Sequence, residues 1–216
     1  MRGRKGVPQE VLPELKEVGG NCARSGTRIT GAGTRIAMEL GSSQRRSYAY
    51  QVALDSYGGD PMNPDWAFAE SKQRRRKLYP VIEPLRAGFK IVEFSNLDDG
   101  VSLNFELTEK RGWFLKDSSE AHAVWTVWLS AAAPVALLVE GRSDVKDIRR
   151  DDVMSDESKS TYRSGQRIID TIHAAGFSLL SAEDVEATVI FKPYQEVFPV
   201  TLFVMLFEEE EVPWWT

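Results

Sequence analysis

Cysteine and histidine, the residues that most often bind metals or attack substrates, are scarce in this sequence. There is one cysteine, Cys22, and there are two histidines, His122 and His173. A single cysteine excludes an internal disulfide and is typical of a reducing compartment. Two distant histidines with one cysteine do not have the spacing of a zinc site. We therefore expect no metal and no cofactor, and a binding protein is better supported than an enzyme.

Long apolar runs are also absent. Residues 1–17, MRGRKGVPQEVLPELKE, include basic residues but no apolar core of the kind that a secretory signal has. Every apolar run is far shorter than the roughly 20 residues that a membrane-spanning helix needs. We expect a cytoplasmic protein that has no membrane partner.

Positive charge is scarce in the second part of the chain. Residues 89–216 hold 12 Lys and Arg against 23 Asp and Glu, whereas residues 1–88 hold 15 against 9. Such a split is typical of a basic arm beside an acidic body. It would also arise if the two parts attract and neutralise each other, and this second interpretation is the one we favour.

Large apolar residues are few in residues 1–45, which are rich in Gly, Arg, Ser and Thr. A segment that cannot bury enough apolar surface stays loosely ordered. The glycine-rich stretch at residues 30–37 lacks the buried strand that precedes a dinucleotide site, so we interpret it as a loop. We predict a loosely ordered or draped N-terminal arm over residues 1–45 and a single domain over residues 46–216.

What the sequence does contain is one dense apolar run near its end. Residues 197–207, VFPVTLFVMLF, hold a single polar residue, Thr201, and four glutamates follow them. The run does not alternate between apolar and polar residues, so both of its faces should be covered. Its shortness and its β-branched and aromatic composition favour an interior strand, and a buried helix is the alternative.

Alternating patterns predict further strands from Phe89 onward, and Asp99 with Gly100 should turn the first two into a hairpin. The strand at 101–108 alternates most cleanly, so we expect it at or near the edge of the sheet. The predicted strands are residues 89–94, 101–108, 123–129, 134–139, 188–191 and 200–207, with a weaker candidate at 48–54.

Two helices are predicted. One begins at Asn63 and ends before Pro80, and the other covers residues 156–175 and ends at Gly176. The second has an apolar stripe that consists of Ile168, Ile169, Ile172 and Ala175. Strands grouped in hairpins with few crossover helices indicate an α+β fold, with a mainly antiparallel sheet of about five or six strands packed against one or two helices.

The function that we favour from the sequence is non-enzymatic protein binding through an acidic surface, as in inhibitors, antitoxins and immunity proteins, which are often small and acidic. Exposed tryptophans beside acidic residues suit a protein partner, above all a basic one, because aromatic side chains anchor interfaces and charge steers association. The candidate partner-binding residues are Glu208, Glu209, Glu210, Glu211, Trp214 and Trp215.

Nucleic-acid binding is the alternative function, because clustered Lys and Arg neutralise phosphates and release counterions. The candidate residues lie on the first predicted helix and are Lys72, Arg74, Arg75, Arg76 and Lys77. Consecutive residues point around a helix in all directions, so only some of them could meet one phosphate backbone. An enzyme of unknown reaction remains the third hypothesis.

Overall fold

The structure is a computed structural model. It describes residues 41–69, 72–95, 101–110, 123–143, 148–193 and 200–207. The predicted arm lies outside the described residues up to residue 40, and so does the predicted turn at Asp99 and Gly100. Residues 42–45, which we expected in the arm, form the first turn of a helix whose Arg45 is buried.

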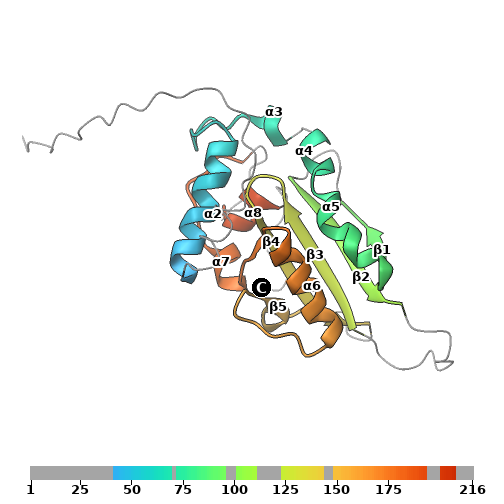
Figure 1. Cartoon of the computed structure of the whole chain (residues 1–216). Helices are drawn as coiled ribbons and strands as arrows, with labels where there is room; N and C mark the ends of the chain where they lie inside the picture. The colour runs from blue at the N-terminus through green and yellow to red at the C-terminus, as the bar shows by residue number, and fades with distance from the viewer. Residues whose placement is uncertain are drawn as a thin grey trace, which may run out of the picture.

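The centre of the fold is a six-stranded sheet (Figure 1). The first five strands pair antiparallel in the order β1-β2-β3-β4-β5, and β6 runs parallel to β4. This confirms the predicted α+β fold with a mainly antiparallel sheet. The strands are β1 (Phe89–Glu93), β2 (Ser102–Glu109), β3 (Ala123–Ser130), β4 (Val135–Arg142), β5 (Val153–Met154) and β6 (Ser178–Leu179).

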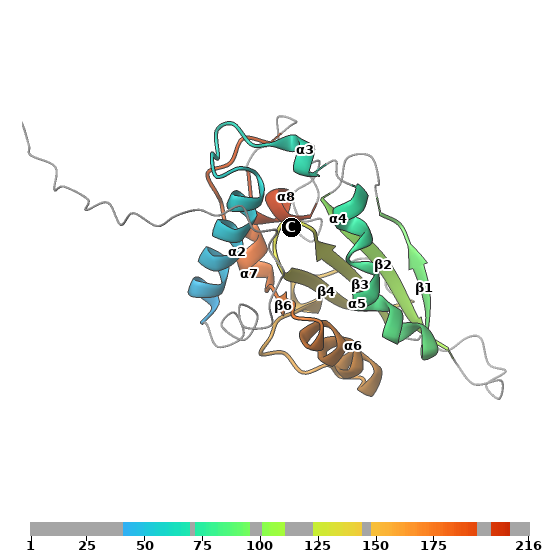
Figure 2. The ribbon, with the colours of Figure 1, turned by 45° about the horizontal axis from the view of Figure 1, so that its top comes forward.

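Helices cover both faces of the sheet (Figure 2). The first face packs on α5 (Tyr79–Ile82), η1 (Glu83–Ala87) and α6 (Arg163–Ala174). The second face packs on α2 (Ser42–Ser56), α7 (Ala182–Glu186) and α8 (Leu202–Leu206). The remaining helical segments are α3 (Trp66–Ala69), α4 (Lys72–Arg76) and η2 (Arg150–Asp152).

Helix α6 confirms the predicted apolar stripe and the predicted end. Ile168, Ile169 and Ile172 are buried against the first face of the sheet. Gly176 has a φ of 93°, and the amide of Phe177 donates to the carbonyl oxygen of Ile172 at 3.1 Å. A left-handed glycine with this bond is the Schellman end of a helix. The helix begins at Arg163, because residues 156–162 form turns and loop instead.

The prediction of an interior strand at the end of the chain is wrong. Residues 202–206 form α8, and every residue from Leu202 to Phe207 is buried. Thr201 makes an isolated β-bridge to Thr188. This bridge is the only β-structure in residues 188–191, where we predicted a strand. A run that is apolar throughout has no period, so burial on all sides was predictable and the backbone conformation was not.

The weak strand candidate at 48–54 is also wrong, since these residues belong to α2. Arg45, Ala49 and Ala53 are buried at a spacing of four, which places them on one side of that helix. The predicted helix after Asn63 is divided into α3 and α4, and Pro80 lies inside the short helix α5. Strand β2 lies next to the edge strand β1, in agreement with the predicted position at or near the edge of the sheet.

Candidate functional site: the outer edge and open face of the sheet

Within the described residues, the second face of the sheet is covered along only part of β2. Ser102 and Asn104 are buried there, and the hydroxyl of Ser102 donates to the carbonyl oxygen of Phe207 at 2.9 Å. Two residues farther along, Glu106 is exposed, and Thr108 is half-buried. On the first face the alternate residues Leu103, Phe105 and Leu107 are all buried. The cover on the second face therefore ends between Asn104 and Glu106.

A hollow of about 680 Å³ begins where this cover ends. Its floor crosses three neighbouring strands, and its rim includes Ile148, Arg149 and Asp152. The floor mixes aliphatic, hydroxyl and carboxylate groups. We call the floor the open sheet face; its residues are Glu106, Thr108, Val124, Thr126, Val139 and Gly141.

Strand β1 forms the end of the sheet beside this face (Figure 2). The amide of Phe94 donates to the carbonyl oxygen of Asn104 at 3.0 Å, and the amide of Lys110 donates to that of Gly88 at 2.9 Å. Antiparallel strands bond through alternate residues. Even-numbered residues of β1 therefore bond to β2, and the N–H and C=O groups of Phe89, Ile91 and Glu93 point outward.

We call these outward groups the outer edge of β1. Within the described residues no strand pairs with this edge. The side chains of Val92 and Phe94 are 44% and 47% exposed, and both lie on the second face because Val92 stands opposite Glu106. The ring of Phe94 meets that of Trp128 edge to face, with centroids 6.0 Å apart. Unpaired backbone and exposed apolar side chains thus occur together on one strand.

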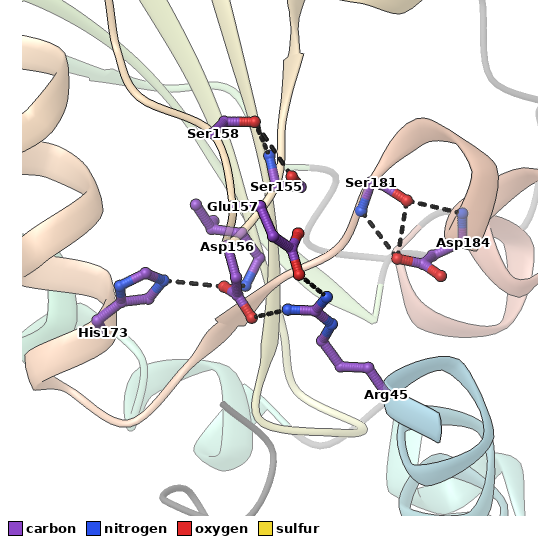
Figure 3. A network of polar contacts seen from close by, with 9 residues as sticks. Arg45, Ser155, Asp156, Glu157, Ser158, His173, Ser181 and Asp184 are labelled. Carbon is purple, nitrogen blue, oxygen red and sulfur yellow. Dashed lines mark hydrogen bonds and ion pairs between the residues drawn. The ribbon is translucent and has the colours of Figure 1, made fainter. Parts of the chain in front are cut away.

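A buried ionic cluster lies elsewhere, where α2, α6 and β6 meet (Figure 3). Arg45 is 2% exposed, and its Nη1 donates to Asp156 Oδ2 at 2.5 Å while its Nη2 donates to Glu157. His173 Nε2 lies 2.9 Å from Asp156 Oδ1, which also accepts from the amide of Leu179 at 2.6 Å. Asp156 thus has partners on three elements.

The pKa values of this cluster indicate a charged, structural arrangement. Burial alone would raise the pKa of Asp156, but the hydrogen bonds from His173, Leu179 and Arg45 outweigh it and hold the pKa below its usual range. Among the described residues no hydroxyl or thiol group is hydrogen-bonded to His173. Through Asp156, these contacts connect α2 to α6 and β6.

Helix α4 separates the arginines that the sequence grouped together. Arg75 is 2% exposed, whereas Arg74, Arg76 and Lys77 are exposed. Partial burial lowers the pKa of Arg74, and the charge of Asp65 opposes this shift. The helix also includes Lys72. The burial of Arg75 therefore removes it from the exposed residues of the predicted basic cluster.

The predicted acidic residues and tryptophans, from Glu208 onward, lie outside the described residues, so this site stays a prediction. The described residues include 17 Lys and Arg against 16 Asp and Glu. The acid surplus of the whole chain consequently belongs to the other residues. In this part of the chain there is no cluster of three or more possible metal ligands, and no helix is long and apolar enough to span a membrane.

Comparisons with protein-family models, with curated proteins and with solved structures find no match. The outer edge of β1 was not found from the sequence, although the strand itself was. The pattern that revealed β1 and β2 as strands contains no information on which of them has a second neighbour. The sequence held one signal of this edge. Val92 and Phe94 are apolar, although they lie on the same face as the charged residue Glu106, which indicates that the face contacts solvent.

Proposed function

We propose that this chain is a non-enzymatic protein-binding protein whose β1 receives an extended segment of its partner. The observation that carries the proposal is the outer edge of β1, where the outward N–H and C=O groups of Ile91 and Glu93 accompany the exposed side chains of Val92 and Phe94. Addition of a strand to a free sheet edge is a recurring mode of peptide recognition. Backbone bonds supply affinity in this mode, and side-chain pockets supply specificity.

The open sheet face is the natural place for that specificity. Lys90 stands opposite Thr108 and Val92 opposite Glu106, so β1 is the neighbour of the first strand that lines the hollow. Alternate side chains of an added strand would point to the same side as Val92 and Phe94. Aromatic and apolar anchors usually dominate the binding energy of such contacts. Apolar residues at alternate positions of the partner are therefore part of the proposal.

The acidic run contributes a second, electrostatic part of the proposal. Glu208, Glu209, Glu210 and Glu211 follow α8 directly. Exposed charges act mainly on the rate of association, so a basic partner would bind faster at low salt. The cytoplasmic location that we infer from the single cysteine belongs to the same proposal.

Affinity capture from the native cell with a matched pair of variants tests the proposal. We expect Val92→Lys to abolish capture of the partner, because a buried lysine would oppose docking on β1. Ile190→Lys is the control, since Ile190 is an apolar residue, 71% exposed, whose carbonyl oxygen accepts a hydrogen bond from Tyr50 of α2. Changing the four glutamates to glutamine should slow association without abolishing it. Capture that survives Val92→Lys would contradict the proposed surface.

Nucleic-acid binding remains the second candidate because Arg74, Arg76 and Lys77 stay exposed. Its test is titration with duplex and single-stranded nucleic acid at low salt, with Arg76→Ala and Lys77→Ala combined as the variant. We expect no binding that depends on these two residues. Tight binding that weakens steeply with salt and disappears in the variant would replace protein binding as the proposed function.

A further inference from the structure

We propose that the strand received by β1 is the β1 of a second copy of this chain, so that two copies form one continuous sheet. This inference rests on the proposed function, because it names the partner of the same edge. Homo-oligomers most often have twofold symmetry, in which the same surface of each copy meets itself. Two copies of one strand can pair in this way only if the side chains of the strand are complementary to those of a second, antiparallel copy.

The direction of the backbone groups restricts how two β1 strands can pair. The outer edge consists of odd-numbered residues, so the hydrogen-bonded pairs between copies must join odd residues to odd residues. A twofold axis that passes beside Val92 meets this condition. It places Ile91 opposite Glu93 of the second copy as a hydrogen-bonded pair, and it makes Val92 opposite Val92 a non-hydrogen-bonded pair.

The side chains favour this register over the one centred on Ile91. With the axis at Val92, the two exposed valines meet, and each Phe94 lies opposite Lys90 of the other copy, whose methylene groups can cover the ring. No two like charges stand opposite each other. With the axis at Ile91, Phe94 would face Gly88 and would stay exposed. With the axis at Glu93, Val92 would meet Phe94, but the two copies of Glu93 would stand opposite each other. The register at Val92 thus covers both apolar side chains of the edge without pairing like charges.

The same symmetry determines where the two open sheet faces lie. Directly opposite residues of paired strands share a face, so both copies of Val92 lie on the second face. The axis must then be perpendicular to the sheet, and the two hollows lie on the same side of the joined sheet. The dimer would present one wide surface to a further partner and leave no free sheet edge at β1.

The experiment has two measurements, both on the full chain. The first is the mass in solution by sedimentation or light scattering, where we expect a dimer that Val92→Lys converts to a monomer and Ile190→Lys does not. The second is cross-linking by a mild oxidant in a Cys22→Ser background. Non-hydrogen-bonded pairs have Cα atoms about 4.5 Å apart, within the range that a disulfide accepts, so Val92→Cys should give a covalent dimer.

Two control cysteines make the register falsifiable. Met62→Cys places a thiol at a side chain that is 62% exposed and so tests random collision. Ile91→Cys tests the neighbouring residue, whose side chain points to the first face. Neither should form a covalent dimer after oxidation. A dimer that survives Val92→Lys, or equal cross-linking at Met62 and Val92, would overturn the inference.

If the chain proves to be a monomer, the capture experiment shows whether the dimer alone is wrong or the proposed function is wrong as well. If the chain is a monomer at all concentrations and Val92→Lys still abolishes capture of another protein, the dimer is wrong and the proposed function stands. If the chain is a monomer and Val92→Lys changes no capture, both are wrong. A concentration-dependent dimer lost in Val92→Lys supports both.

Discussion

The two faces of β2 have the same backbone and opposite surroundings. On the first face Leu103, Phe105 and Leu107 are all buried in the cluster that includes the helices of that face. On the second face the cover ends after Asn104, and Glu106 is exposed. Residues on the first face hold the domain together, whereas the uncovered half of the second face is where we propose that a partner binds. On this proposal, stability and binding belong to different faces of one strand.

The largest effect should come from the covered face. Phe105→Ala removes a wholly buried ring and should lower the free energy of unfolding by about 3–5 kcal/mol. Glu106→Ala, one residue away on the open face, should change it by less than about 0.5 kcal/mol. Chemical denaturation of both variants measures the contrast. Similar losses for the two would mean that the second face is covered after all.

The ionic cluster should show a somewhat smaller effect. Arg45→Met leaves Asp156 buried without its main cationic partner and should cost about 3 kcal/mol. Arg46→Met, at the next and less buried position, is the matched control. The double variant Arg45→Met with Asp156→Asn should recover part of the loss, because it also removes the buried negative charge. A double variant that is less stable than Arg45→Met would contradict this account.

The same cluster predicts a dependence of stability on pH. The pKa of Asp156 is lower in the folded chain than its ordinary value of 3.8, so its ionised form stabilises the folded state at neutral pH. This contribution is complete above the ordinary value and is lost as the pH falls through the folded value. Asp156→Asn should flatten the decline of stability below about pH 4, whereas Asp170→Asn, at an exposed position of α6, should not. Equal pH profiles would show that Asp156 is not stabilised by its partners.

The end of α6 should give the smallest loss of the series. Gly176 has a φ of 93°, a conformation that costs an L-residue about 1–2 kcal/mol. Gly176→Ala should therefore lower the free energy of unfolding by about that amount. Ala175→Gly is the control, because it exchanges the same two residue types at the neighbouring exposed position, where the backbone angles are helical. It should cost under about 1 kcal/mol. Thermal unfolding compares the two.

The sequence predicted the fold most securely where the pattern is periodic, and it gave the wrong backbone conformation for the uniform run at the end of the chain. The alternation of Leu103, Phe105 and Leu107 and the stripe of Ile168, Ile169 and Ile172 each have a period, and both elements were predicted correctly. The run from Leu202 to Phe207 has none, so its burial was predicted correctly and its helix was not. Local residue choice cannot decide between a strand and a single helical turn when every side is enclosed.

The candidate site was less predictable than the fold, because it depends on β1 having no neighbouring strand on one side. An outer edge exists only where no later segment pairs, and this is a property of the tertiary arrangement. The buried pairing of Arg45 with Asp156 has the same origin, since these residues are far apart in the chain. Sequence reasoning placed Arg45 in the arm and grouped Arg75 with the surface cations, and the structure buries both.

The measurement that tests the central claim most directly is amide hydrogen exchange along β1, in the dilute protein and in the complex or dimer. The amides of Lys90 and Val92 bond to β2 and should be protected in both states. The amides of Ile91 and Glu93 point outward, so they should exchange fast in the dilute protein and slowly once a strand is added. Ile91 and Glu93 amides that exchange equally in both states would contradict the claim that the outer edge of β1 is the binding site.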